Sequence, residues 1–200
     1  MIIATIAPAL EAVELYNVKF NGTLDHPSAF RGEPNPELDA AWDRIAVDPR
    51  PFRVTSEILE KIGQPERPSS VRFSDEDGGG FMATIEVSHQ IHCLNMLRKH
   101  THLDYYESTD MSVADGPELY RMHLDHCIEM LRQLILCTAD TGVITYDWVQ
   151  GYSRPYPNFN TLHTCRNVDR ILEWNDQHGL HEPLSRLVRL DHEVDLDIAP

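Results

Sequence analysis

The feature that most constrains this 200-residue chain is a five-residue pattern, His-x-x-His-Cys, that occurs twice. One copy runs from His89 to Cys93 and the other from His123 to Cys127. Positions i, i+3 and i+4 lie on one face of an α-helix, so each copy presents two imidazoles and one sulfur to the same side. The repeat therefore predicts two helices that pack together through their histidine-bearing faces.

The residues around both copies have helical spacing. After Gly116-Pro117, apolar residues and the histidines of the second copy recur at steps of three and four residues as far as Cys137. Before the first copy, Ser88 is suited to be an N-cap, and apolar residues continue the helix to about His100. The flanking sequence thus supports the same two helices that the motifs predict.

Weaker patterns predict the remaining elements. Residues 1–35 have no sustained period and contain several glycines and prolines, so we expect an extended arm with few partners of its own. Helices are expected at 36–45, 55–62 and 167–178, strands at 71–73, 81–87 and 143–148, and loops at 100–116 and 151–159. The glycine-rich segment 75–80 predicts a hairpin turn between the first two strands.

Together these patterns predict an α+β, helix-dominated fold in which two motif-bearing helices pack together. A small β-hairpin and an extended N-terminal arm complete it. The expected organisation is an arm of residues 1–35, a catalytic domain of residues 36–180, and an acidic, loosely held C-terminal tail of residues 181–200.

Charge and hydropathy exclude several classes of partner. The chain has 17 Lys and Arg against 32 Asp and Glu, which gives a formal net charge of −15. This charge repels phosphate backbones and anionic lipids, so no nucleic-acid partner is expected. No apolar run approaches the roughly 20 residues that a membrane span requires, so the chain as given is expected to be soluble.

The duplicated motif has the chemistry of a metal site. Neutral imidazole binds copper, zinc, iron or nickel, and a thiolate adds a soft ligand. The alternative is that the histidines are ordinary core residues with hydrogen-bond partners, but the duplication together with the adjacent cysteine favours a site. For Cys93 and Cys127 two alternatives stay open: a disulfide between the two helices, or free thiols.

Two further sets of residues are candidates for supporting roles. Asp125 and Asp140 lie close to the second motif and are candidates for orienting a ligand imidazole through its other nitrogen. The alternative is that they are ordinary surface or capping carboxylates. An aromatic strand and loop are candidates for a substrate wall, although core packing would also explain them: Tyr146, Trp148, Tyr152, Tyr156 and Phe159.

The tandem motif and its flanks resemble the fungal UstYa-type oxidases. The resemblance rests on Val87–Asn95 and His123–Ile128, on Cys137-Thr-Ala-Asp140, and on the downstream His163-Thr-Cys165 and Trp174. It implies a tailoring enzyme that acts on a small-molecule or peptide substrate in secondary metabolism. Oxidative cyclisation, hydroxylation, desaturation and halogenation are the reactions associated with that family.

The resemblance also implies cofactors and residue roles. Copper would be the metal and O2 the oxidant, with His89, His92, His123 and His126 as the catalytic metal ligands. Cys93 and Cys127 would lie near the metal or form a disulfide, and Cys137 with Cys165 would form another. Self-association or pairing with a related protein is implied, and relatives are membrane-anchored in the secretory pathway, which leaves the location of this chain open.

Two other functions are kept beside the oxidase. The first is a non-oxidative cyclase in which histidine acts as general acid or base. The second is a metal-binding accessory partner of another tailoring enzyme.

Overall fold

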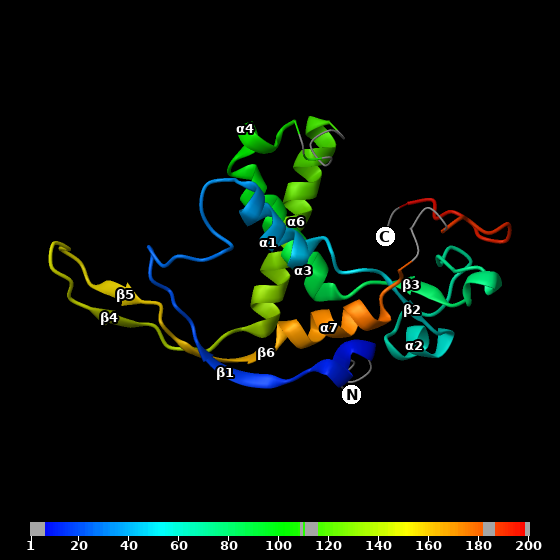
Figure 1. Ribbon diagram of the computed structural model, residues 1–200, viewed down its shortest axis with the longest axis horizontal. Coiled ribbons are helices and arrows are strands. Elements are labelled where there is room, and N and C mark those ends of the chain that lie inside the picture. Colours follow the sequence, from blue (N-terminus) through cyan, green and yellow to red (C-terminus); the bar gives the residue numbers. More distant parts are fainter. Residues whose placement is uncertain (1–6, 109, 111–115, 182–186, 199–200) are drawn as a thin grey trace. The chain divides into compact units, whose positions relative to one another are not determined.

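The computed structural model describes residues 7–108, 110, 116–181 and 187–198 (Figure 1). It is an α+β, helix-dominated fold, as predicted. The described chain divides into two compact units. The motif unit comprises residues 14–48 and 86–167, and the terminal unit comprises the described parts of residues 1–13, 49–85 and 168–200. The domain boundaries after residues 35 and 180 stay a prediction.

Four helices build the described part of the motif unit. They are α1 (Pro36–Ala46), α3 (Glu86–His100), α4 (Leu103–Tyr106) and α6 (Pro117–Thr138). Asn35 caps α1 by accepting a hydrogen bond from the backbone N–H of Leu38 at 2.9 Å. Pro117 opens α6 because a proline at the first helical position loses no intrahelical hydrogen bond. The two motif helices are therefore where the sequence predicts them.

The core of this unit lies between α3 and α6. It consists of Cys93 and Met96 from α3, and Tyr120, Leu124 and Cys127 from α6. Both cysteines are completely buried, and Leu124 is 2% exposed. Apolar burial is the main favourable term in folding, so this contact holds the two motifs together. The predicted packing of the two helices through their motif faces is confirmed.

Two small sheets complete the motif unit. β1 (Leu15–Lys19) pairs antiparallel with β6 (Leu162–Arg166), and β4 (Thr145–Asp147) pairs antiparallel with β5 (Tyr156–Asn158). The prediction of an N-terminal arm with few partners is therefore wrong, because β1 is hydrogen-bonded to β6. The predicted loop 151–159 contains β5, and α4 lies in the predicted loop 100–116, of which residues 109 and 111–115 are outside the described part.

The terminal unit packs short elements around one aromatic core. Its elements are η2 (Pro8–Ala12), β2 (Phe52–Val54), α2 (Ser56–Lys61), η3 (Asp75–Asp77), β3 (Phe81–Ala83) and α7 (Val168–His178). Phe52, Val54 and Phe81 pack against Trp174 of α7. The buried Asn175 accepts from the backbone N–H of Arg50 at 2.7 Å and donates to its carbonyl at 2.8 Å, which ties α7 to the chain before β2.

Three predictions about the terminal unit and its junction need correction. β3 pairs mainly with β2, whereas the predicted partner 71–73 contributes a single bridge between Arg72 and Phe81. Helix α3 begins at Glu86, so Ser88 is a buried helical residue and not an N-cap. Within the predicted loose tail, Glu193 accepts a hydrogen bond from the backbone N–H of Arg72 at 3.1 Å.

Candidate metal centre

The four motif histidines meet between α3 and α6, which run antiparallel at this point. His89 lies beside His126, with ring centroids 5.5 Å apart, and His92 lies beside His123, at 5.6 Å. Within each helix the two rings are 6.4 Å and 6.3 Å apart. The four imidazoles therefore form a closed, four-sided group, which we call the histidine cluster.

Three ligand atoms of the cluster region come close enough to share one ion. They belong to His89, Cys93 and His126, and all lie within 4.8 Å of one another. The Nε2 atoms of His89 and His126 are 3.5 Å apart, and Nε2 of His89 is 3.7 Å from Sγ of Cys93. Tetrahedral ligands at roughly 2.0–2.3 Å from a metal are separated by about 3.3–3.8 Å, so the two separations at His89 match those of ligands that share one ion.

This trio differs from the four-histidine set implied by the resemblance. It contains two of the four histidines together with Cys93, whose role the sequence left open. His92 and His123 face each other on the other side of the cluster. Burial, followed by the neighbouring His123 and His89, lowers the pKa of His92, which favours its neutral imidazole. A metal-binding role for all four histidines stays a prediction.

Burial changes across the trio. Cys93 is completely buried, His89 is partly buried and His126 is exposed. An ion held by the trio would therefore have its sulfur side inside the helix pair and its His126 side toward solvent. Catalytic metal sites keep an open position for water or substrate, and the exposed His126 side is where such a position would lie.

Cys127 lies against Cys93 from the opposite helix. Burial raises the pKa of Cys127 to about 12, and the hydrogen bond to Cys93 contributes in the same direction. The thiol form of Cys127 is therefore favoured, and Cys93 is the cysteine whose sulfur lies beside His89. All four cysteines are free thiols in the structure, with Cys137 exposed and Cys165 partly buried. Disulfide pairing stays a prediction.

A thiol count separates the two alternatives for the cysteines. We expect the purified chain, denatured without reductant, to have four reactive thiols, because Cys93 and Cys127 contact each other as thiols. In the native state the exposed Cys137 should react first and the buried pair last. Alkylation followed by mass spectrometry would locate each modified cysteine. A count of two or zero would show that disulfides form.

The two candidate carboxylates do not orient a motif histidine. Asp125 pairs with Arg121 one helical turn away, with Nε of Arg121 3.1 Å from the carboxylate, because the i, i+4 spacing brings them together on the outer face of α6. Asp140 lies 2.9 Å from Nδ1 of His163, beyond the end of α6. Both positions correct the expectation that these carboxylates contact a ligand imidazole.

The sequence analysis missed the contacts of His163. Its Nε2 lies 2.6 Å from the hydroxyl of Thr161, and its ring stacks on Phe20 with centroids 3.9 Å apart. The result is a hydrogen-bonded chain from Asp140 through His163 to Thr161. No local signal reveals it, because Asp140 and His163 are 23 positions apart and meet only through the return of the chain in β5 and β6.

A buried polar network holds α3 in place beside α1. Asp39 of α1 lies 2.8 Å from Nη2 of Arg98, and the hydroxyl of Tyr106 donates to the same carboxylate oxygen at 2.7 Å. Arg98 also donates to the Tyr106 hydroxyl at 2.8 Å and to the side-chain oxygen of Asn95 at 2.8 Å. This network fixes the helix that carries the first motif.

The network predicts a stability change in alkaline solution. Burial and then the hydrogen bond to Asp39 raise the pKa of Tyr106 to about 12, above its ordinary value of 10.0. Because the folded pKa is raised, Tyr106 contributes stability below pH 10 and loses it as the pH rises from 10 to about 12. The difference in unfolding free energy between the wild type and Tyr106→Phe should shrink over that range in urea titrations. A constant difference would contradict the prediction.

The structure does not bring the predicted substrate wall to the cluster. Tyr146, Trp148, Tyr152, Tyr156 and Phe159 all lie on or beside the β4–β5 hairpin, which projects away from α3 and α6 (Figure 1). Trp148 is 78% exposed and Tyr146 is 63% exposed. Their contact with a substrate stays a prediction, and the structure gives no contact between them and the motif histidines.

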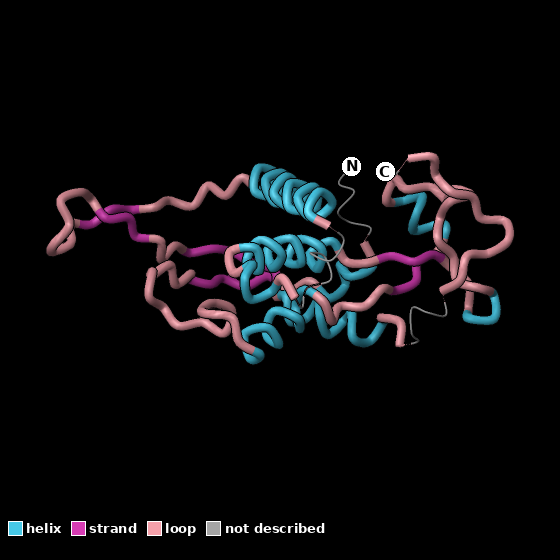
Figure 2. The backbone as a smooth tube through the Cα atoms, turned by 90° about the horizontal axis from the view of Figure 1, so that it is seen from above, coloured by secondary structure: helices cyan, strands magenta, loops and turns pink. Residues whose placement is uncertain are grey.

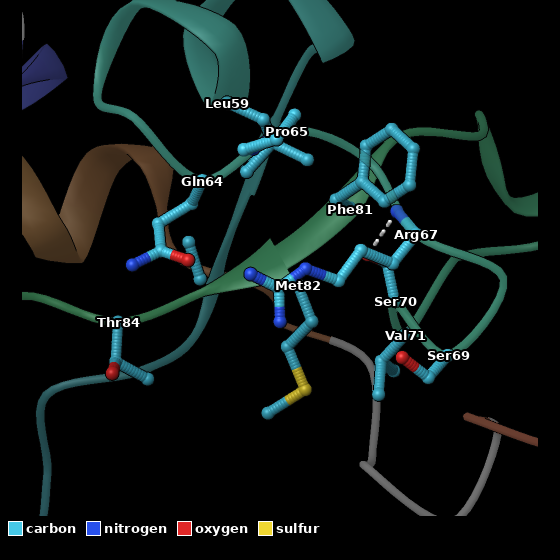
Figure 3. A pocket seen from close by; sticks show the side chains of 11 residues that line it. Leu59, Gln64, Pro65, Arg67, Ser69, Ser70, Val71, Phe81, Met82 and Thr84 are labelled. Carbon is cyan, nitrogen blue, oxygen red and sulfur yellow. Dashed lines mark hydrogen bonds between the residues drawn. The ribbon is translucent and has the colours of Figure 1, made fainter. Parts of the chain in front are cut away.

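A cavity of about 370 Å³ lies in the terminal unit. Leu59, Val71, Phe81 and Met82 contribute apolar parts of its wall, and Arg67 extends its guanidinium across it (Figure 3). No residue of either motif lines this cavity. It therefore adds no group to the histidine cluster.

Comparison with known proteins gives a consistent family. Residues 3–178 match the family model described as "Mycotoxin biosynthesis protein UstYa". The chain is 37% identical over 182 residues to the UstYa family oxidase aprY of Aspergillus flavus and 34% identical over 174 residues to the UstYa family oxidase phomYc of Diaporthe leptostromiformis. Each alignment covers 84% of this chain.

A third relative has a different name. The transacylase cctO of Talaromyces islandicus is 27% identical over 180 residues, which cover 86% of this chain and 60% of cctO. The chain spans 54% of aprY and 67% of phomYc, that is, from about half to two thirds of these relatives. No solved structure matches the chain.

The residues that carried the resemblance all lie inside the matched segment. The described part of the chain contains no helix with the length and apolar character of a membrane span. With the family model matching nearly the whole chain and relatives at 34–37% identity, the chain belongs to the UstYa family.

Proposed function

We propose that this protein is a copper-dependent oxidase that tailors a fungal secondary metabolite, with a peptide-derived compound as substrate. The names of the relatives support an oxidase role in such pathways, and aprY and phomYc are both named as UstYa family oxidases. The proposed reaction is oxidative cyclisation, hydroxylation, desaturation or halogenation, with O2 as the oxidant.

The observation that carries the proposal is the approach of His89, Cys93 and His126 to within 4.8 Å of one another. Two imidazoles and a thiolate are ligands that bind copper, and such His2Cys sets occur in copper proteins. When bound, copper supplies one-electron redox chemistry that amino-acid side chains lack.

The residues around the trio would control the site. Cys127 packs with Cys93 in the core between α3 and α6 and would help to hold its sulfur in place, as partners of metal ligands commonly do. The buried contact of Leu124 and Met96 excludes water from the sulfur side. His126, on the exposed side, lies where a substrate can approach.

Copper alone tests this proposal before a substrate is identified. We expect one equivalent of Cu(II) to bind tightly to the full chain and to give a visible thiolate-to-copper absorption band. Cys93→Ser should abolish that band, whereas Cys137→Ser, at an exposed cysteine on the same pair of helices, should leave it unchanged. An unchanged band in Cys93→Ser would exclude the trio.

Oxygen consumption tests the oxidase step. With ascorbate as electron donor, the copper-loaded chain should consume O2, and the His89→Ala variant should not after removal of unbound copper. Failure of the wild-type chain to consume O2 while it binds copper would favour the accessory, metal-binding function over the oxidase.

We propose acyl transfer as a second candidate function, because the Asp140–His163–Thr161 chain has the donor and acceptor spacing of a nucleophile, a base and an orienting carboxylate. The name of cctO, a transacylase, is consistent with it. This function is non-oxidative and uses a histidine outside the cluster.

In that reaction the Thr161 oxygen would attack the carbonyl of an ester or thioester donor and pass its proton to Nε2 of His163. The donor's alkoxide or thiolate would leave with that proton. An alcohol or amine would then attack the acyl-threonine, and its proton would return through His163 to the Thr161 oxygen.

A nitrophenyl ester distinguishes the two functions. Acyl transfer predicts a covalent acyl group on Thr161, found by peptide mass spectrometry, and its loss in His163→Gln with copper binding unchanged. The neighbouring Thr164→Ser variant, on the same strand, serves as the control. An unlabelled Thr161 in the wild type would exclude this second function.

A further inference from the structure

The β4–β5 hairpin has one face without charged side chains, whereas the other, which we call the polar face, carries Asp147 and Arg154 together with Tyr152 and Tyr156. Tyr146 lies opposite Pro157 in the register of the two strands. Side chains two residues apart on a strand point to the same side, so Ile144, Trp148 and Phe159 share the face of this pair. The charged residues of the hairpin, Asp147 and Arg154, have the opposite parity. We call the first side the apolar face of the hairpin.

The large side chains of the apolar face are exposed to solvent. Ile144 is 45% exposed, Tyr146 63%, Trp148 78% and Phe159 42%. Antiparallel sheets with such alternation normally pack one face on a core, and a contiguous apolar surface left exposed usually marks an interaction site. In two views the hairpin projects from the motif unit with no described helix of that unit beside it (Figures 1 and 2).

The hairpin also lacks the means to be stable alone. It has two strands of three residues each, and every residue of β4 is exposed. An isolated two-stranded hairpin is marginally stable at best in water, and further packing is needed to hold it. Packing of another surface on the apolar face would therefore stabilise it.

The charge distribution makes the hairpin the place where a second copy of this chain can approach. The chain has a formal net charge of −15, so two copies repel each other over most of their surface. Residues 141–160 contain only two charged residues, Asp147 and Arg154, which cancel. Neither side chain has an ion-pair or hydrogen-bond partner in the described chain. The hairpin is thus a neutral segment through which two acidic copies can meet.

We propose that the β4–β5 hairpins of two copies pack together through their apolar faces and form a symmetric dimer. In a two-fold symmetric contact, both partners use the same surface patch. A face without charged side chains can pack against a copy of itself without charge repulsion. Aromatic residues such as Tyr146 and Trp148 are the types that dominate such contacts. The unpaired Asp147 and Arg154 stay on the polar faces, outside the apolar contact.

The size of the face sets the strength of the dimer. The exposed parts of its four large side chains come to roughly 400 Å² per copy, taking about 150–250 Å² for each whole aromatic side chain. The resulting total of about 800 Å² lies below the roughly 1,200–2,000 Å² of standard interfaces, so the dimer should be weak and concentration-dependent. It does not depend on the proposed oxidase function.

Sedimentation of the full chain tests the dimer. We expect the mean mass to rise from monomer toward dimer as the concentration rises from about 5 to about 500 µM, the range of a small interface. Trp148→Ser should raise the dissociation constant at least about tenfold, because a central tryptophan is commonly a hot spot. The control is Val143→Ser, since Val143 is also 78% exposed but has the parity of the polar face.

Acrylamide quenching provides a second measurement. Trp42 and Trp174 are 8% and 7% exposed, so quenchable emission reports mainly Trp148. The fraction of emission that acrylamide quenches should fall as the dimer forms. A monomer at every concentration would overturn the proposal. If Trp148 of that monomer is protected from acrylamide, the hairpin packs on its own chain. If Trp148 is accessible to acrylamide, a different molecule covers the apolar face. A dimer unchanged in Trp148→Ser would also overturn it.

Discussion

The His89→Ala variant is expected to bind Cu(I) at least about 100-fold more weakly than the wild type, since loss of a ligand exceeds the 10–100-fold effect of losing an outer partner. His89 is the residue whose Nε2 lies near both His126 and Cys93. His126→Ala should have a similar effect. Competition with a colorimetric Cu(I) chelator would measure the affinities.

The other histidine pair makes the test specific. His92→Ala should weaken binding by about tenfold or less, because His92 is outside the trio and acts as an outer partner at most. His163→Ala, away from both motifs, is the control. Equal losses in His89→Ala and His92→Ala would support the four-histidine set instead. Circular dichroism should show that the helical content of each variant is unchanged.

The Leu124→Ala variant is expected to lower the free energy of unfolding by about 2–5 kcal/mol, the usual cost of truncating a buried leucine. Leu124 is 2% exposed and packs among Cys93, Cys127, Met96 and Tyr120, so the cavity would form beside the proposed metal ligands. Urea denaturation of the full chain, followed by the helical signal, would measure the change.

Leu136→Ala is the matched control for this effect. Leu136 lies on the same helix and is 64% exposed, so its truncation should change the unfolding free energy by no more than about 0.5 kcal/mol. Because both variants replace leucine by alanine in α6, the change in helix propensity is the same in both and does not contribute to the difference between them. Similar losses in the two variants would show that the contact between α3 and α6 does not hold the motif unit together.

The two motif copies are related by an approximate local two-fold axis. The first histidine of each copy meets the second histidine of the other, which gives two equivalent sets: His89, Cys93 and His126, and His123, Cys127 and His92. Ligand atoms come together in the first set, whereas in the second set burial raises the pKa of Cys127 and favours its thiol form. A repeated motif in the sequence therefore produces a site in which the two copies have different roles.

Elements with strong periodicity were predictable, and so were α2, β3 and β4, which lie within longer predicted segments, whereas the other short elements were not. Helices α1, α6 and α7 lie where apolar spacing and proline predicted them, because an amphipathic stripe needs several turns to be recognised. β2, β5, β6 and the four-residue α4 were missed, since segments of three to five residues contain too few positions to show a period. β1 was missed because its partner β6 is more than 140 positions away.

The sequence by itself determined that each motif lies on a helix and that its histidines and cysteine share a face, because i, i+3 and i+4 spacing follows from helical geometry. Only the tertiary structure decided which of these groups meet. The antiparallel packing of α3 and α6 fixes the axial shift of one helix relative to the other and the rotation of each helix about its axis. Local periodicity specifies neither the shift nor the rotation. That packing sets His89 beside His126 and places Cys93 with them at the buried end of the site.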